Sequence, residues 1–499
     1  MAKIIYTDSP GRLDIEQTLW VYNGLDCCVT KEVWDKIPRP EWAKVAYEDL
    51  NEDQAPLLDM MLRGLRVDRE RRDRLLAEVN LKIDRCRDIG TFYGKEVFGQ
   101  PLNPNSNDQL KFILYDTMGL PVCYEKDKKT GERKASVNRD ALEKLSSYIH
   151  ARPICLLAIA IRDLIKERTV LNSTVDEDNY MRCSYNGAGA ETFRLSSSQN
   201  CYGGGTNFQN ITDEKRDMFI SEPGYKFGYM DLEQAESRVV GLLAFLATGI
   251  SKYLDACESG DLHTTVARMV WKNLPWTGET KKDKAIAETP FYRHFTYRDM
   301  AKRGGHGSNY NGKPYTIAKN LKVEQKLIEQ FQDLYFTEFR EIKLWHTDTA
   351  KRLQLDGFID TPWGHRRHFL GRRWDDETLK EAIAHVPQST IGMLMRKIQQ
   401  KLWKEQYKIG FRLRTNDHDA VKFTYPQERE AEIIEQIKSI ALIPIPCSSR
   451  KVIIPVDVKV GWNIRTASAA NPLGLRKLPD ERTYTSPTSV FDRGFPGIY

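Results

Sequence analysis

Acidic residues with the spacing of a catalytic site occur in two distant stretches of the chain. The first stretch, GYMDLEQAESRVVGLLA, holds Asp231, Glu233 and Glu236, and acids at a helix start often serve only to cap it. The second, TNDHDAVKFTY, holds Asp419 beside His418 at the tip of an expected hairpin. Two carboxylates at strand ends can bridge a pair of Mg²⁺ ions about 3.5–4 Å apart, an arrangement suited to phosphoryl transfer. Such a site needs no histidine or cysteine cluster.

A cationic helix face would complete a phosphate-handling site. In YRDMAKRGGHGSNYNG, Arg298, Lys302, His306 and Tyr310 recur at intervals of four residues and therefore share one helix face. The two cations would hold a triphosphate, and the two rings would face a sugar and a base. The glycines of GGHG each cost about 1 kcal/mol in a helix interior, which favours a substrate approach or a moving helix. The alternative is a solvated charged face with aromatic core contacts.

A polar loop is the third candidate element. In AETFRLSSSQNCYGGGTNFQNI, the Arg, Ser, Asn and Gln side chains suit sugar edges, phosphates and minor-groove acceptors. Composition alone fits an ordinary polar loop equally well.

The elements that must position these residues indicate an α+β protein with several subdomains. Helix-type periodicity predicts helices early in the chain, and strands mixed with helices follow. In chain order we expect a helix through TLWVYNGLDCCVTKEVWDKI, helical regions at 41–63 and 69–178, loops at 180–212, a strand leading into a helix at KFGYMDLEQ, helices over 239–356, a hairpin at GFIDTPWGHRRHFLG, a helix at 377–407, a hairpin at FRLRTNDHDAVKFTY and an irregular tail.

Composition limits the compartment and the partners. Charged residues make up 29% and hydrophobic residues 40% of the 499 residues, which is typical of globular proteins. We find no apolar run of about 18 residues and no secretory leader, so no membrane association is expected. The nine cysteines show no zinc-type spacing, and nine free thiols indicate a reducing, intracellular compartment. The net charge of +6 permits a polyanionic partner without demonstrating one.

The order of these segments resembles family A DNA polymerases, the bacterial DNA polymerase I class and its phage relatives. The family motif D-Y-S-Q-I-E-L-R is present as DLEQAESR, and R-x-x-x-K-x-x-x-F/Y-x-x-x-Y-G is met by the Arg298 to Tyr310 series with Gly312 one place late. H-D-E is present as HDA, T-G-R-L-S-S-S…L-Q-N-I as TFRLSSS and NFQNI, D-I-H-T as DLHT, and T-x-x-G-R-R-R as TPWGHRR. The resemblance extends from about residue 41 to residue 464.

The resemblance implies a right-hand polymerase fold, with a palm built on an antiparallel sheet and with mostly helical fingers and thumb. The expected domains are the last helix of an exonuclease domain (1–40), the palm (41–68, 179–238 and 376–464), the thumb (69–178), the fingers (239–375) and an irregular tail (465–499).

The resemblance also implies a template-directed DNA polymerase that adds dNMP to a primer 3′-hydroxyl with two Mg²⁺ ions, for which Mn²⁺ could substitute. Its partners would be primer-template DNA and dNTPs, and its location would be the cytoplasm of a bacterium or of a phage-infected host. The implied metal ligands are Asp231, Asp419 and the carbonyl of Leu232, and Lys302 is also a candidate proton donor to the leaving group. The implied dNTP-binding residues are Arg298, Lys302, His306, Tyr310, His263, Gln234 and Glu236. Among them, Glu236 would exclude a ribose 2′-hydroxyl. The implied DNA-binding residues are Arg194, Gln388, His418, Asn207, Gln209 and Arg366.

Three positions depart from the family pattern. His306 stands where the family has Phe or Tyr, so its discrimination against dideoxynucleotides does not carry over. Ala420 replaces an acid that supports the metal site, and Asp417, two residues before Asp419 on the same strand face, is a candidate substitute. The family's P-x-Q-G stretch is one residue shorter here and reads PQST, so the assignment of Gln388 to the family's glutamine depends on how this gap is placed.

The N-terminus carries part of a second motif. Tyr22 and Asp26 match the Y-x-x-x-D motif that ends a 3′–5′ exonuclease domain in the family, whereas its distant acidic strand has no counterpart in the sequence. We therefore expect no proofreading by this chain. A separate exonuclease subunit or a processivity factor could be a further partner, and replication and repair both remain open as roles.

Three other functions could use similar residues. A single-subunit RNA polymerase would share the aspartates and the cationic helix, but it must admit the 2′-hydroxyl and would not be expected to carry Glu236. A nuclease would need the absent exonuclease ligands. A catalytically inactive nucleic-acid-binding module would have lost a metal aspartate, and both are present.

Overall fold

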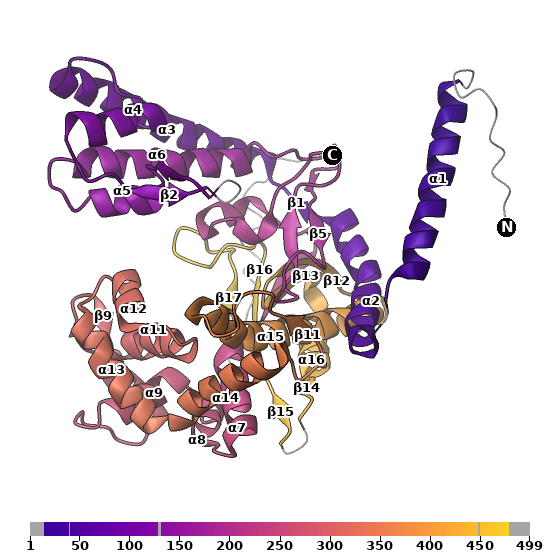
Figure 1. Ribbon diagram of the computed structural model, residues 1–499. Helices are drawn as coiled ribbons and strands as arrows, with labels where there is room; N and C mark the ends of the chain where they lie inside the picture. The colour runs from indigo at the N-terminus through magenta and orange to yellow at the C-terminus, as the bar shows by residue number, and fades with distance from the viewer. Residues whose placement is uncertain (1–13, 39, 128–130, 448–449, 479–499) are drawn as a thin grey trace.

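A five-stranded antiparallel sheet forms the centre of the protein, as the α+β prediction requires. The computed structural model describes residues 14–38, 40–127, 131–447 and 450–478 (Figure 1). The strand order is β12-β13-β7-β16-β17. The strands are β7 (Tyr225–Leu232), β12 (Arg412–Asp417), β13 (Ala420–Pro426), β16 (Val456–Gly461) and β17 (Arg476–Lys477). The two hairpins and the strand-to-helix transition expected from the sequence are therefore confirmed, apart from their end residues.

Long helices pack around this sheet and bring in a buried polar seam. Helix α15 (Asp376–Ile409) contacts both α2 (Glu41–Arg63) and β12, and α16 (Glu430–Ala441) contacts β13 and β16. Where α2 crosses α15, the fully buried Asp53 accepts hydrogen bonds from Arg396 (2.7 Å) and Gln400 (2.9 Å). A buried charge is costly unless it is paired, so separating α2 from α15 at this point would leave the charges of Asp53 and Arg396 buried without their ion pair.

Short strands occupy the region expected to be loops. The pairs are β1 (Leu65–Arg66) with β4 (Tyr180–Met181), and β5 (Ser184–Asn186) with β6 (Ser196–Ser198). Two or three residues are too few to show an alternating pattern, so periodicity did not predict these strands. The other short elements outside the helical arm and the expected fingers are η3 (Phe208–Asn210), η4 (Asp213–Met218), η5 (Gln427–Arg429), β14 (Pro444–Ile445) and β15 (Val452–Ile453).

Residues 69–178 form a helical arm that projects from the sheet (Figure 1). Two long helices, α3 (Arg69–Phe98) and α6 (Arg152–Leu171), pack along each other. The far end has its own apolar core, which includes Leu110, Leu114 and Leu142. The shorter elements there are α4 (Asn107–Lys111), η2 (Phe112–Thr117), β2 (Tyr124–Lys126), β3 (Arg133–Ala135) and α5 (Arg139–Leu145). The β2-β3 hairpin was not expected from the sequence.

The segment expected to form the fingers is mostly helical and shares the main core with the sheet. Its helices are α7 (Ala235–Thr248), α8 (Lys252–Glu258), α9 (Leu262–Val270), α10 (Thr280–Ala287), α11 (Tyr297–Asn309), α12 (Pro314–Leu321), α13 (Gln325–Glu338) and α14 (Arg340–Asp356). Two hairpins accompany them, β8 (Pro290–Tyr292) with β9 (Phe295–Thr296), and β10 (Phe358–Asp360) with β11 (Arg366–His368).

Helix α11 is continuous through its glycines, and packing explains two of them. A Cβ atom on Gly304 would lie 2.8 Å from the ring of Phe331 in α13. One on Gly307 would lie 2.8 Å from Ile317 in α12. Packing against α12 and α13 therefore accounts for glycine at these two positions, and a substrate approach or a movement of the helix stays a prediction.

The two ends of the described chain differ from expectation in opposite ways. Helix α1 (Ile15–Lys36) was expected to be amphipathic, yet it stands apart from the body, and even Trp20 is 69% exposed (Figure 1). The expected irregular tail is wrong for residues 465–478, because β17 joins the central sheet beside β16 and Leu475 is buried. The remaining tail residues, 479–499, lie outside the described ranges. No helix in those ranges is long and apolar enough to cross a membrane.

Candidate functional site

Strand pairing brings the two aspartates together. Asp231 lies near the end of β7, and Asp419 lies in the two-residue turn between β12 and β13. Ala420 pairs directly with Asp231 across the sheet, and the Leu232 N–H donates to the Asp419 carbonyl at 3.3 Å. His418 has φ +57°, a left-handed conformation that suits a tight hairpin turn. The hairpin therefore places Asp419 beside the end of β7.

Burial and mutual repulsion perturb both carboxyl groups. Burial, followed by the charge of Asp419, raises the pKa of Asp231 to about 6, and Lys459 partly opposes this. Burial also raises the pKa of Asp419, where Arg194 acts in the opposite direction and Glu236 adds to the rise. Negative charge is thus unfavourable here unless a cation compensates it.

Glu236 connects three of the predicted residues. Arg194 Nη2 donates to Glu236 Oε1 at 2.8 Å and to both oxygens of Asp419 at 3.3 Å. His306 Nδ1 lies 3.5 Å from Glu236 Oε2, and the His306 and Tyr310 rings meet edge to face at 5.0 Å. Burial and the charge of Glu236 raise the pKa of Tyr310, so its phenol stays protonated. The carboxylate of Glu236 therefore lies among a guanidinium, an imidazole and a phenol.

A cavity of about 640 Å³ opens beside the aspartates, between α7, α9, α11 and α12. It collects most of the residues that the sequence predicted for metal and nucleotide binding. The predicted residues in its lining are Asp231, Leu232, Gln234, Glu236, His263, Lys302, His306 and Asp419. The lining also includes Ser237, Arg303 and Asn320, which the motifs did not indicate.

Arg298 lies outside this lining, in a bidentate ion pair with Asp261 at 2.8 and 3.0 Å. A contact between Arg298 and a triphosphate would have to compete with Asp261. Nearby, burial and the charge of Arg298 lower the pKa of His263 to about 4, although Asp261 opposes them. His263 is therefore a neutral imidazole at physiological pH, able to donate one hydrogen bond.

Several predicted DNA-binding side chains already have partners within the protein. Asn207 accepts from the Ser197 hydroxyl (2.8 Å) and the Gln209 N–H (2.9 Å), and so caps a short 3₁₀ helix. Gln209 donates to the Leu195 carbonyl at 3.0 Å. Arg366 forms a bidentate pair with Asp360. Gln388 is half-buried on α15 and His418 is exposed in its turn. Contact of these residues with DNA stays a prediction.

The acids around Asp231 are arranged differently from the sequence hypotheses. The Asp417 carboxylate is paired with Lys422 and lies 3.4 Å from Arg216, so two cations already compensate it. Asp457 pairs directly with Asp231 on the other side of β7, and motif matching missed it. The alternation in VDVKVG, which puts Asp457 and Lys459 on one strand face, was the available signal.

Glu233 also differs from its expected role. It precedes the left-handed cap residue Gln234, so it lies outside α7, and its carboxylate is 3.9 Å from Lys477. Glu236 is the acid in the first turn of α7.

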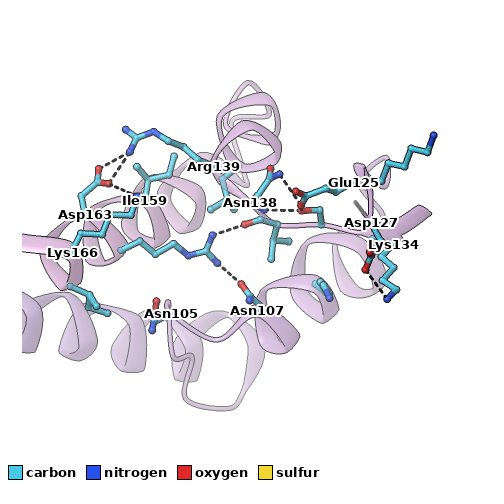
Figure 2. A pocket seen from close by; sticks show the side chains of 18 residues that line it. Asn105, Asn107, Glu125, Asp127, Lys134, Asn138, Arg139, Ile159, Asp163 and Lys166 are labelled. Atoms are coloured by element: carbon cyan, nitrogen blue, oxygen red, sulfur yellow. Dashed lines mark hydrogen bonds and ion pairs between the residues drawn. The ribbon is translucent and has the colours of Figure 1, made fainter. Parts of the chain in front are cut away.

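A second large cavity, of about 1000 Å³, lies in the helical arm between α6 and the β2-β3 hairpin (Figure 2). Arg162 lines this cavity and donates to the Val137 carbonyl (2.6 Å) and to Asn107 (2.7 Å). Cations outnumber acids in the lining. The cations are Lys111, Lys126, Lys134, Arg139, Arg162 and Lys166, and the acids are Glu125, Asp127 and Asp163.

Comparisons with known proteins agree on one family. A model of the family described as DNA polymerase family A matches residues 92–466. The thermostable DNA polymerase I of Thermus filiformis is 27% identical over 425 residues, covering 81% of this chain and 46% of that protein. DNA polymerase I of Chloroflexus aurantiacus is 26% identical over 471 residues, covering 89% of this chain and 46% of that protein. The chain thus spans about half the length of the curated relatives it matches.

A solved structure supports the same fold. The polymerase domain of Pol1 from M. smegmatis, in complex with a DNA primer-template and dNTP, superposes with a TM-score of 0.66 at 22% identity. That likeness covers 83% of this chain and 69% of the other. Because the family model matches three quarters of the sequence, the chain belongs to DNA polymerase family A.

Proposed function

We propose that this protein is a template-directed DNA polymerase that adds dNMP to a primer 3′-hydroxyl. The observation that carries the proposal is the adjacency of Asp231 and Asp419 in the lining of a cavity that Lys302 also lines. The relatives that cover most of this chain are named DNA polymerase I, and the solved relative was captured with primer-template and dNTP.

The donor atoms at the site fit Mg²⁺. Among the residues that the structure describes, no three His, Cys, Asp or Glu side chains converge on a metal position. Asp231, Asp419 and the Leu232 carbonyl would therefore supply only part of the coordination, and substrate phosphates would supply more, as Mg²⁺ sites commonly allow. A bound pair of Mg²⁺ ions would lower the pKa of the primer hydroxyl and neutralise charge on the triphosphate.

The protein's own groups would then bind and orient the nucleotide. Lys302 would contact the triphosphate and donate a proton to the departing pyrophosphate, and the neutral His263 would donate a hydrogen bond to a phosphate oxygen. Glu236, held by Arg194, would occupy the space that a ribose 2′-hydroxyl needs. The contact of Arg194 with a minor-groove acceptor at the primer end would require it to turn from Asp419.

The helical arm would bind the duplex product. The excess of cations around its cavity suits phosphate contacts, which supply most of the affinity of proteins for DNA. Nucleotide addition itself would take place at the central sheet and the helices around α11.

Primer extension with purified protein tests the proposal. We expect extension with dNTPs and Mg²⁺ and very little with NTPs, which would separate a DNA polymerase from an RNA polymerase, a nuclease or a binding module. Glu236→Ala should increase incorporation of ribonucleotides, since it empties the space facing the sugar. Failure of the parent protein to extend any primer would overturn the proposed function.

A further inference from the structure

Arg396 is a fully buried cation that contacts the backbone next to the candidate site. Its side chain is 1% exposed and pairs with Asp53 on α2 at 2.7 Å. Nε donates to the Phe193 carbonyl at 2.8 Å, and Nη2 donates to the Gly187 carbonyl. With three acceptors fixed on three segments, the planar guanidinium has one orientation that satisfies them all.

The segment that Arg396 holds has an unfavourable backbone conformation. Phe193 has φ +56°, in the left-handed region that is unfavourable for a residue with a Cβ atom. Its ring packs edge to face on His365 with centroids 4.3 Å apart, and its N–H donates to the Ala190 carbonyl at 3.0 Å. A residue stays in this region only when surrounding contacts stabilise it, and the bond from Arg396 is one of these contacts.

Helix α15 also makes room for this segment one turn before Arg396. Gly392 lies four residues earlier and therefore on the same helix face. A Cβ atom at Gly392 would lie 3.0 Å from the Thr192 carbonyl oxygen, 3.2 Å from the Phe193 carbonyl carbon and 3.3 Å from the Arg194 nitrogen. The backbone at 192–194 thus lies directly against α15. Gly392 leaves room for this backbone, and Arg396 donates a hydrogen bond to it.

The next residue is Arg194, whose guanidinium bonds both Glu236 and Asp419. The carbonyl that Arg396 holds belongs to the peptide unit that joins Phe193 to Arg194. A rotation of the Phe193–Arg194 peptide would change the direction in which the Arg194 side chain leaves the backbone.

We propose that Arg396, seated beside Gly392, is a positioning residue that holds Phe193 in its left-handed conformation and thereby directs Arg194 at Asp419 and Glu236. The expected change in kcat rests on the proposed function. The expected position of the Arg194 side chain does not depend on it.

Two variants disturb this contact in different ways. Gly392→Ala adds a methyl group against residues 192–194, leaves Arg396 paired with Asp53, and favours helix formation. The double variant Asp53→Asn/Arg396→Gln removes the guanidinium without leaving a buried charge unpaired. A matched control is Glu222→Gln/Arg414→Gln, since that arginine–carboxylate pair is also largely shielded from solvent but bonds other segments.

A double-mutant cycle with Arg194→Ala provides the kinetic test. In the parent background we expect Gly392→Ala to lower kcat several-fold and Asp53→Asn/Arg396→Gln at least tenfold. In the Arg194→Ala background neither change should lower kcat by more than twofold, because the residue they act through is absent. Equal losses in both backgrounds would overturn the proposal, because they would show a general effect on the fold. The control pair should give the same change in both backgrounds.

Crystal structures of the two variants test the geometry without any need for activity. We expect Arg194 to leave Asp419, with Phe193 changed in φ. An unmoved Arg194 in both variants would overturn the inference, even in a protein that extends primers normally. If the parent extends no primer, the proposed function fails, and the structures still decide the placement of Arg194.

Discussion

Asp231 should lower the free energy of unfolding of the metal-free protein, and comparison with Asp231→Asn measures this effect. Asp231 has a pKa of about 6 in the folded protein, chiefly because of burial, compared with 3.8 as the ordinary value. A difference of about two pKa units corresponds to about 3 kcal/mol, since each unit is worth about 1.36 kcal/mol.

The sign follows from proton binding. Between pH 3.8 and pH 6 the folded state retains the Asp231 proton while the unfolded chain releases it, so the free energy of unfolding falls as the pH rises. Above about pH 6 the full penalty is present, and below pH 3.8 it is absent. Asp231→Asn removes the titrating group. The variant should therefore be more stable than the parent by up to about 3 kcal/mol at pH 8, and equally stable near pH 4.

Urea denaturation in EDTA, followed by circular dichroism at both pH values, measures this difference. Mg²⁺ should then stabilise the parent at pH 8 and not the variant, because a ligand stabilises only the protein that binds it. Asp283→Asn is a control of opposite sign. Burial raises the pKa of Asp283, but hydrogen bonds from Thr277 and Gly278 outweigh this and lower it, so Asp283→Asn should destabilise the protein at pH 8. A parent as stable as Asp231→Asn at pH 8 would refute the reasoning.

The remaining predictions concern activity and protonation. Asp419→Asn should abolish nucleotide addition yet leave primer-template affinity within about threefold in a filter-binding assay, because affinity comes mainly from phosphate contacts; more than a few per cent of residual activity would contradict the metal assignment. His306→Phe should raise the KM for dNTP, because the imidazole nitrogen that lies 3.5 Å from Glu236 can form a hydrogen bond and a phenyl ring cannot; an unchanged KM would leave only a packing role for His306. Purified protein should not degrade a mismatched primer end, since Asp26 is exposed on α1, which stands apart from the body (Figure 1); degradation lost in Asp26→Ala would contradict this. The His263 imidazole should show no titration between pH 5.5 and 8 by NMR, because its pKa is about 4; a midpoint in that range would show that the site is wetter than its burial implies.

The sequence was sufficient for the family, the fold class and most of the polar residues that line the cavity beside Asp231 and Asp419. The motifs can be recognised at 26–27% identity because each one combines particular side chains with a particular local backbone conformation. The acid at the end of β7 and the turn holding Asp419 are examples. Local periodicity also predicted α15 and both hairpins, because each depends on contacts between residues close in the chain.

Contacts between distant segments could not be predicted in this way. The pairing of Arg298 with Asp261, the closure of β17 onto the sheet and the helix packing at Gly304 depend on which segments meet in space. Their sequence signals are single residues with many plausible roles. The same holds for Asp457, whose position beside Asp231 is visible only once β16 is paired with β7.

The sequence by itself determined which residue types are available for phosphoryl transfer, because the chemistry depends on carboxylates and cations that motifs preserve. Only the tertiary structure decided which of them face one another and which are already neutralised by a partner. Arg194 illustrates the difference, since its motif predicts a DNA contact, while its position beside Asp419 depends on a helix 200 residues further along the chain. The physical reason is that electrostatic and packing energies depend on distance and burial, and the folded chain alone sets both.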